Sequence, residues 1–375
     1  MKRTLSKTAA VHNPCSKHFE ASEPKQSITT AASLPAFLMD LTRLEQILDR
    51  ASSRRITVIG DLMLDEFVWG KVGRISPEAP VPVVEVTGES FYPGGAANVA
   101  RNLREFVDCV AIIGLLGKDR SGQHLRELLS EQKIDTSNTV EEATFHTIVK
   151  TRIIARQQQV VRVDREKFVG TSAAQIEGVV AAVRKNISDI DAIIFEDYGK
   201  GFLSTELVSQ IADAARSSRK IVAADPNPRN LVEWRGLTVI KPNRTEAFLA
   251  AGILSCDPDI VPSQDTDLKR AGKTLLKKWE AENVLITLGE QGMMLFQKKK
   301  APHYIPTKAR EVFDVSGAGD TAVALFTLGL ACGATPTEAA EIANYASAVV
   351  VSKLGTATVT RDELIASFRG DSEGG

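Results

Sequence analysis

The feature that most constrains the fold is an alternation of short apolar strands and amphipathic helices in the second half of the chain. Buried strands are predicted in "DAIIFEDYG" (191–199), "KIVAADPN" (220–227) and "NVLITLGEQG" (283–292). Helical periodicity separates them, as in "TELVSQIADAARSS" (205–218) and "LKRAGKTLLKKWEA" (268–281). This rhythm predicts an α/β fold with a doubly wound, mostly parallel sheet and helices on both of its faces.

Two β-rich segments, at about 67–92 and 146–165, interrupt the rhythm. Residues 146–166 alternate like a β-ribbon, and the prolines near residue 80 favour an edge strand or a turn. We expect the two segments to form a small second sheet, a β lid over one edge of the main domain. The predicted domain spans 36–368, begins with a helix in 36–53, and lies between a disordered extension (1–35) and a disordered tail (369–375).

Composition excludes several classes of function. The 375 residues are 43% hydrophobic and 25% charged with a net charge of −1, which is ordinary for a globular protein and gives no reason to expect nucleic acid or membrane partners. No apolar run approaches the roughly 18 residues that a transmembrane helix needs. Four scattered cysteines lack zinc-site spacing and indicate free thiols in a reducing cytoplasm. The first 18 residues contain Lys and Arg but no acidic residue, as organelle-targeting peptides do, but a disordered extension remains the favoured interpretation of 1–35.

A glycine-rich turn at 314–320, "DVSGAGD", precedes an apolar helix. Gly317, Ala318 and Gly319 allow backbone N–H groups to surround an anion at the electropositive helix start. Asp320 is then positioned to accept a proton from a hydroxyl group. A capped helix with a tight entry turn is the structural alternative.

Two further elements carry groups that suit sugar hydroxyls. Gly94 and Gly95 precede a helix that contains Asn98, which offers both a donor and an acceptor. Asp61 and Asp65 follow the first strand and accept hydrogen bonds. A helix entry turn and solvated loop acids are the respective alternatives.

The last two elements suit a nucleotide and its metal ion. Asn243 and Glu246 lie three residues apart at a helix start, and such oxygen ligands suit Mg²⁺ beside phosphates. Local sequence alone favours the alternative, an N-terminal capping box. Thr287, Gly289 and Gly292 end a strand in a turn. Because ligands of open α/β sheets bind where strands end at their carboxyl side, we expect all five elements to meet at one edge.

Together these motifs resemble the ribokinase-like sugar kinases, the family that includes phosphofructokinase B. GGAAN (94–98) and DVSGAGD (314–320) match its two signatures, and KPNxxE (241–246) and TLGxxG (287–292) also fit. The resemblance covers about 55–368. It implies an ATP-dependent kinase with Mg²⁺, a monovalent cation such as K⁺, and a homodimer formed through the lid. Val315 stands where the second signature usually has threonine.

The resemblance also implies roles for the candidate residues. Asp320 matches the catalytic base, and Gly317, Ala318 and Gly319 match the anion hole. The implied sugar contacts are Asp65, Gly94, Gly95 and Asn98. Asp61 is a further candidate for the sugar because of its place at the end of the first strand. The implied Mg²⁺ and phosphate contacts are Asn243 and Glu246. The implied nucleotide contacts are Asn243, Thr287, Gly289, Gly292 and Asn344.

Several stretches narrow the resemblance to one branch of the family. "GDLMLDEFVWGKVGRISPEAPVPVVEV", "RVDRE", "EDYGKG" and "SKLGTATVT" are similar to kinases that convert D-glycero-β-D-manno-heptose 7-phosphate to the 1,7-bisphosphate for lipopolysaccharide synthesis. The candidate cations for the 7-phosphate are Arg74, Lys200 and Arg162. The histidines form no HxGH pair, the motif of the cytidylyltransferase domain fused to many such kinases, so we expect kinase activity alone.

Three alternatives remain open at this point. The chain is another sugar or sugar-phosphate kinase of the same fold, or a binding protein that has lost activity. A nicotinamide dehydrogenase is disfavoured because the first strand ends in GDLMLD and lacks the G-x-G-x-x-G turn.

Overall fold

The computed structural model describes residues 39–156, 158–254, 260–309 and 311–372. The extension predicted to be disordered at 1–35 lies outside these residues. None of the described helices is long and apolar enough to cross a membrane.

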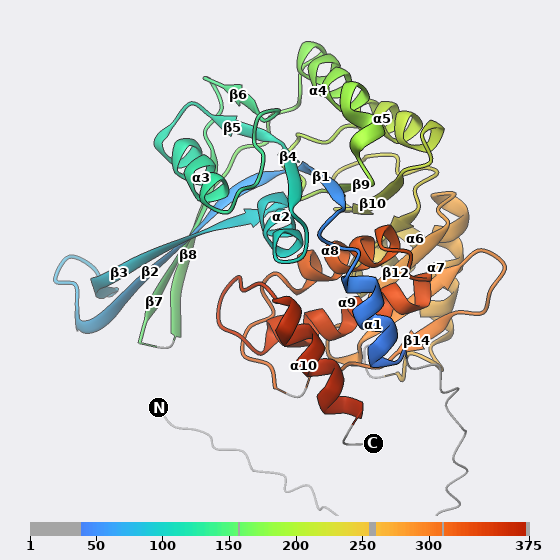
Figure 1. The fold of residues 1–375 in the computed structure, drawn as a ribbon. Helices are drawn as coiled ribbons and strands as arrows, with labels where there is room; N and C mark the ends of the chain where they lie inside the picture. The colour runs from blue at the N-terminus through green and yellow to red at the C-terminus, as the bar shows by residue number, and fades with distance from the viewer. Residues whose placement is uncertain (1–38, 157, 255–259, 310, 373–375) are drawn as a thin grey trace, which may run out of the picture. The chain divides into compact units, whose positions relative to one another are not determined.

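An eight-stranded sheet forms the centre of the fold, in the order β14-β13-β12-β11-β10-β9-β1-β4 (Figure 1). The strands from β4 to β12 pair in parallel, and β13 and β14 add an antiparallel edge. The mostly parallel, doubly wound sheet was predicted from the βα rhythm. Its strands are β1 (Arg55–Gly60), β4 (Cys109–Ile113), β9 (Ala192–Glu196), β10 (Ile221–Asp225), β11 (Val239–Ile240), β12 (Asn283–Thr287), β13 (Met293–Gln297) and β14 (His303–Ile305).

Helices cover both faces of this sheet and form two hydrophobic cores. On one face, Leu44, Val99 and Phe326 belong to the first core, which contains the buried side chains of α1 (Leu41–Leu48), α2 (Ala96–Arg104), α3 (Arg120–Glu131), α8 (Ala318–Ala331), α9 (Pro336–Val351) and α10 (Arg361–Ser372). On the other face, Val180 and Ile211 belong to the second core, with α4 (Ala173–Asn186), α5 (Thr205–Ser217), α6 (Arg244–Ala251) and α7 (Thr266–Lys278). Successive strand residues alternate between the two cores, because side chains of a strand point to opposite faces.

The carboxyl ends of neighbouring strands are aligned by the sheet register. Gly60 of β1 pairs with Glu196 of β9, which in turn pairs with Asp225 of β10. Gly60 is required here, because a Cβ atom would lie 2.1 Å from the carbonyl oxygen of Glu196. Acidic residues at the ends of β9 and β10 are thereby brought side by side.

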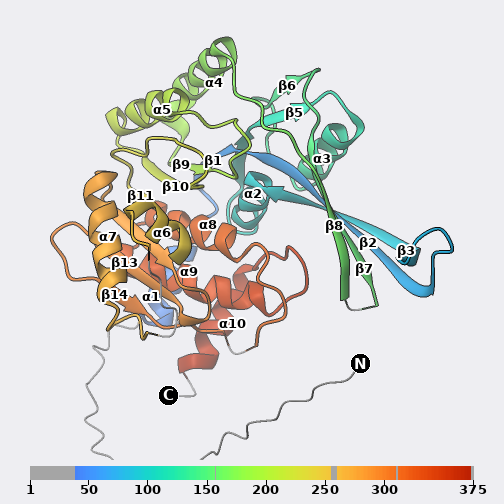
Figure 2. The same ribbon diagram turned by 180° about the vertical axis from the view of Figure 1, so that it is seen from behind.

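A second sheet has the order β3-β2-β7-β8 and extends away from the large sheet (Figures 1 and 2). It consists of β2 (Leu62–Ile75), β3 (Pro82–Gly95), β7 (Ile148–Ala155) and β8 (Gln158–Arg165). The β-rich segments thus form a second sheet, with the proline-containing strand β3 at its edge; its action as a lid stays a prediction. A two-stranded sheet of β5 (Leu115–Gly117) and β6 (Val140–Glu142) lies nearby.

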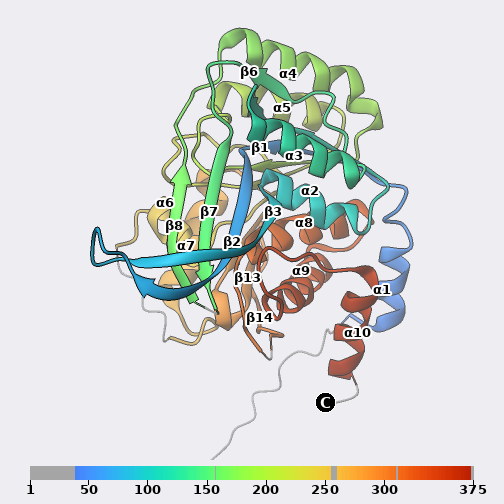
Figure 3. The ribbon, with the colours of Figure 1, turned by 90° about the vertical axis from the view of Figure 1, so that its left-hand side faces the viewer.

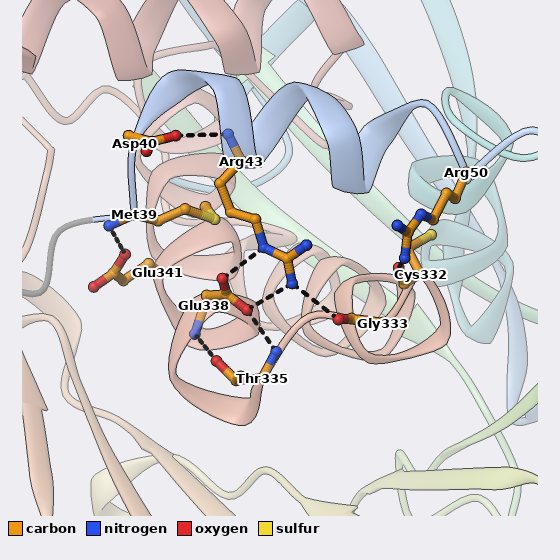
Figure 4. A network of polar contacts seen from close by, with 9 residues as sticks. All are labelled: Met39, Asp40, Arg43, Arg50, Cys332, Gly333, Thr335, Glu338 and Glu341. Atoms are coloured by element: carbon orange, nitrogen blue, oxygen red, sulfur yellow. Dashed lines mark hydrogen bonds and ion pairs between the residues drawn. The ribbon is translucent and has the colours of Figure 1, made fainter.

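Hydrogen bonds join helix α1 and the residue before it to the turn between α8 and α9 and to α9 (Figure 4). Arg43 Nε donates to Glu338 Oε1 at 2.8 Å, and its Nη2 donates to the carbonyl of Gly333 at 3.1 Å. The N–H of Met39 donates to Glu341 Oε2 at 3.1 Å. Together with the buried side chains of Leu44 and its neighbours, these contacts make α1 part of the first core.

The last helix of the described residues, α10, lies beside α1 (Figure 3). We expected the domain to end at residue 368, but α10 continues to Ser372. Residues 373–375 of the predicted tail lie outside the described residues.

Candidate active site

A cavity of about 710 Å³ opens at the carboxyl edge of the large sheet. It is lined by residues that end β9, β10 and β12 and by the starts of α6 and α8. Ten of the residues singled out from the sequence line it: Asn243, Glu246, Thr287, Gly289, Gly292, Gly317, Ala318, Gly319, Asp320 and Asn344. The structure therefore brings the glycine turn and the predicted nucleotide elements to one place.

Asp320 lies in the first turn of α8 and is 5% exposed. Gly317 begins this helix with φ of +81°, a conformation that side chains other than hydrogen rarely allow. Asn98 Nδ2 donates to Asp320 Oδ2 at 2.7 Å. The two glycine signatures thus meet through a direct contact between their polar residues, although 222 residues separate them.

Tyr198, which follows β9, contacts the same carboxylate. Its hydroxyl donates to Asp320 Oδ1 at 2.8 Å. Burial, and then the nearby charge of Asp320, raises the pKa of Tyr198 well above its usual range, so the phenol stays a neutral donor. Sequence analysis did not single out this residue, although it lies in the stretch "EDYGKG" on which the resemblance partly rests.

The pKa of Asp320 is raised to about 6. Burial is the main cause, and the hydrogen bonds from Asn98 and Tyr198 oppose it by stabilising the charged form. The carboxylate is therefore largely ionised at neutral pH yet accepts a proton easily, which are the two properties of a general base.

Acidic side chains gather beside Asp320. Among the described residues, Glu196, Asp225 and Asp320 each place one carboxylate oxygen so that all three atoms lie within 4.8 Å of one another. Lys241 Nζ lies 2.7 Å from Asp225 Oδ2. Burial, followed by the charges of Asp225 and Asp320, raises the pKa of Glu196 well above its usual range. Sequence analysis did not identify this cluster. The signal that could have revealed it is that two successive predicted strands both end in an acidic residue.

The residues present fit Mg²⁺, which the family resemblance implies. Glu196 is buried, and its Oε2 atom has no hydrogen-bond partner in the described part of the chain. A divalent cation bound by carboxylates would offset the cost of burying such a group. Glu246 also lines the cavity and supplies a further carboxylate.

Asn243 and Glu246 form a capping box at the start of α6. Asn243 Oδ1 accepts from the N–H of Glu246 at 2.9 Å, and Glu246 Oε2 accepts from the N–H of Asn243 at 2.8 Å. The structural reading of this pair is therefore correct, and its predicted contact with Mg²⁺ stays a prediction.

The predicted nucleotide residues surround the other side of the cavity. Asn243 and Thr287 form a bridge that places α6 beside the end of β12. Gly289 and Gly292 have φ of +60° and +92°. Asn344 of α9 donates through Nδ2 to the carbonyl of Pro306 at 2.7 Å.

The predicted sugar residues lie where the second sheet joins the first. Asp65 is buried, and its Oδ1 accepts from Arg152 Nη1 at 2.5 Å. A Cβ atom on Gly94 would lie 2.2 Å from Asp65 Oδ2, so only glycine fits there. Gly95 starts α2 with φ of +60°.

Asp61 is engaged with the protein backbone. Its Oδ2 accepts from the N–H groups of Tyr198 and Lys200 at 2.9 and 3.0 Å, and its Oδ1 accepts from that of Phe202 at 3.3 Å. Both carboxylate oxygens thus hold the loop after β9. Asp61 therefore positions this loop, and its predicted contact with the sugar stays a prediction.

The three cations predicted for a sugar phosphate do not line the cavity. Lys200 Nζ pairs with Glu166 at 2.8 Å, and Arg162 pairs with Asp164 through two bonds of 2.8 and 2.9 Å. Arg74 is exposed near the far end of β2. Their role in binding a phosphate stays a prediction.

The α/β sheet carries a buried aspartate at a glycine-flanked helix start. This aspartate lies beside a cavity that contains the residues predicted to bind a nucleotide and a metal ion, an arrangement typical of kinases of the ribokinase-like class. Residues 53–363 match the description "pfkB family carbohydrate kinase". The chain belongs to this family of ATP-dependent sugar kinases.

Similar proteins support this placement. The chain is 41% identical over 328 residues to the Bifunctional protein HldE of Citrifermentans bemidjiense, and 42% identical over 327 residues to that of Pelobacter propionicus. These matches cover 88% and 87% of the chain but only 66% of each relative's length.

Solved structures show the same fold. Phosphofructokinase-2 from Escherichia coli in complex with potassium has a TM-score of 0.67 at 19% identity, covering 85% of this chain and 99% of its own. Arabidopsis thaliana ribokinase complexed with ribose and ATP has a TM-score of 0.63 at 17% identity, covering 84% and 99%.

Proposed function

We propose that this protein transfers the γ-phosphoryl group of ATP to the anomeric hydroxyl of D-glycero-β-D-manno-heptose 7-phosphate. The product would be the 1,7-bisphosphate, an intermediate on the way to ADP-heptose and the lipopolysaccharide core, made in the cytoplasm. The observation that carries the proposal is the contact between Asp320 and Asn98, which joins the two signatures at one buried carboxylate. The heptose itself rests on the similarity of stretches such as "RVDRE" and "EDYGKG" to heptose 7-phosphate kinases.

In this mechanism Asp320 takes the proton of the acceptor hydroxyl. The hydroxyl oxygen forms a bond to the γ-phosphorus while the bond to the bridging oxygen of ADP breaks. N–H groups at the start of α8, exposed by Gly317 and Gly319, stabilise the charge on the phosphoryl oxygens. Positioning and electrostatics supply most of the rate in such transfers.

The metal ion belongs to the same proposal. Glu196, Asp225 and Glu246 would hold Mg²⁺, which when bound neutralises charge on the β- and γ-phosphates. Lys241, paired with Asp225 and lining the same cavity, offers a further positive charge to the nucleotide. K⁺ is the monovalent cation to test.

A second candidate is another sugar kinase of the family. The pairing of Lys200 with Glu166 and of Arg162 with Asp164 favours it, because these cations are already neutralised within the protein. An acceptor without a phosphate would need neither of them.

The test is phosphoryl transfer from ATP to a panel of sugars and sugar phosphates, with the product position read by ³¹P and ¹³C NMR. The proposal expects heptose 7-phosphate to have the highest kcat/KM and to gain a phosphate at C1. A higher kcat/KM for an unphosphorylated sugar would favour the second candidate. Omitting Mg²⁺, and replacing K⁺ by Na⁺, tests the two ions separately.

We also propose that two copies associate through the second sheet. On its outer face Val68, Ile153 and Val161 form a cross-strand row, beside which Val163 is 50% exposed. Exposed apolar side chains grouped on one sheet face are typical of an interface.

A further inference from the structure

The face of the second sheet that carries Asp65 contains two rows of polar side chains. Residues paired directly across neighbouring strands point to the same face of a sheet. One row consists of Asp65, Lys150 and Asp164, and the next consists of Phe67, Arg152 and Arg162. Asp65 borders the candidate sugar site, so this face is the one turned toward an acceptor.

Most cations near this face are neutralised by a neighbouring acid. Arg152 pairs with Asp65, Arg162 pairs with Asp164, and Lys200 of the loop after β9 pairs with Glu166. Binding a phosphate with any of them would require an existing ion pair to open.

Lys150 is different. It is half-buried, and its ammonium makes no hydrogen bond or ion pair with the residues that the structure describes. Its Nζ lies instead over the ring of Tyr198, 5.3 Å from the centroid. Burial lowers the pKa of Lys150, the charge of Asp65 opposes that effect, the like charge of Lys200 adds to it, and the charges of Glu166 and Asp164 oppose it further. A half-buried ammonium of this kind gains from an anionic ligand.

The position of Lys150 relative to the base is also defined. The hydroxyl of Tyr198 donates to Asp320, while the face of the same ring contacts Lys150. The ammonium and the carboxylate base are therefore separated by a single tyrosine side chain. A sugar that presents one hydroxyl to Asp320 would extend its far end along this ring toward Lys150.

We propose that Lys150 binds the phosphate group of a sugar phosphate acceptor and so selects phosphorylated over unphosphorylated sugars. The inference deepens the proposed function and rests on it. It assigns the recognition to a lysine on β7 rather than to Arg74, Lys200 or Arg162.

The test compares Lys150→Met with Lys71→Met, a matched change at an exposed lysine of the same sheet. Steady-state kinetics are measured with heptose 7-phosphate, with the unphosphorylated heptose and with ATP. A hydrogen bond between charged groups predicts that Lys150→Met raises KM for the sugar phosphate by about ten- to a hundredfold. KM for ATP and kcat/KM for the unphosphorylated sugar should be unchanged, and Lys150→Arg should retain most of the discrimination.

Three results would overturn the inference. A KM for the sugar phosphate within about twofold of the wild-type value would remove Lys150 from phosphate binding and leave the proposed function intact. A parallel loss with the sugar phosphate and the unphosphorylated sugar would assign Lys150 a structural role. Failure of the wild-type enzyme to use any sugar phosphate would remove the proposed function itself. If Lys150→Met does not fold, Lys150→Gln keeps a polar side chain and is subject to the same criteria.

Discussion

The carboxylate of Asp320 is the single group whose loss should stop chemistry without preventing nucleotide binding. Asparagine has the same shape but cannot take a proton. We expect Asp320→Asn to lower kcat by several orders of magnitude, because a positioned base contributes about 10²–10⁴-fold and the buried hydrogen bonds to Asn98 and Tyr198 are disturbed as well. Stopped assays measure kcat and calorimetry measures the affinity for ATP. Near-normal turnover would contradict the role of Asp320 as base.

A change at Tyr198 tests how the pKa of Asp320 is set. Its hydrogen bond lowers the pKa of Asp320, so Tyr198→Phe should raise that pKa above about 6. A hydrogen bond to a charged group corresponds to a shift of roughly one pH unit. The acidic limb of the profile of kcat/KM against pH should therefore move upward. A lower rate with an unmoved limb would mean that Tyr198 supports the structure without tuning the base.

Some contacts of the candidate site could be predicted from the sequence, and others could not. The meeting of Asp320 with Asn98 was predictable, because both follow glycine turns at helix starts. The cluster of Glu196 and Asp225 was not, since it depends on the register that pairs these two residues across β9 and β10. For Asp61, local sequence could not show that three backbone N–H groups from 198–202 donate to its carboxylate, and its contact with a sugar stays a prediction.

At the scale of elements, periodicity located the helices well. The predicted helices at 205–218 and 268–281 correspond to α5 (Thr205–Ser217) and α7 (Thr266–Lys278). The strand β2 was less evident, because it begins at Leu62, directly after β1, and crosses from one sheet to the other. Hydrophobic pattern alone does not reveal such a change of sheet.

Helix α1 lies outside residues 53–363 of the family match, yet it contributes to the first core. Ile47 is 1% exposed, and Ile47→Ala should lower the free energy of unfolding by about 2–5 kcal/mol. Urea denaturation measures the loss, and Gln46→Ala, on the exposed face of the same helix, is the control. Equal stability of the two variants would mean that α1 is dispensable for folding.

For the whole molecule, the buried acids predict how stability depends on pH. Burial raises the pKa of Asp197 to about 7, whereas the unfolded chain has a value near 3.8. The folded state therefore binds more protons than the unfolded state between about pH 4 and pH 7, and stability should fall as the pH rises through this window. Urea denaturation across the window measures the slope. Asp197→Asn should flatten it, and an unchanged slope would contradict the shifted pKa.

The outer face of the second sheet predicts the assembly state. Val161 and Val163 are 45% and 50% exposed on β8. If two copies associate there, Val161→Lys combined with Val163→Lys should give a monomer, because a buried unpaired charge is costly. Sedimentation velocity measures the mass, with Val312→Lys, at an exposed valine outside this sheet, as the control. A wild-type monomer, or a variant that still dimerises, would exclude this interface.

Asp61 joins the two sheets in a way that has a mechanical consequence. It is the single residue between β1 and β2, and its side chain anchors the loop that carries Tyr198. If the β2–β3 hairpin moves as a lid, the movement would be centred near the residue that holds the loop whose Tyr198 hydroxyl donates to Asp320. We therefore expect binding of the acceptor and alignment of the Asp320 carboxylate to be coupled. Water cannot move the hairpin, so the carboxylate would be poorly aligned with it. Little ATP would then be hydrolysed without transfer to the acceptor.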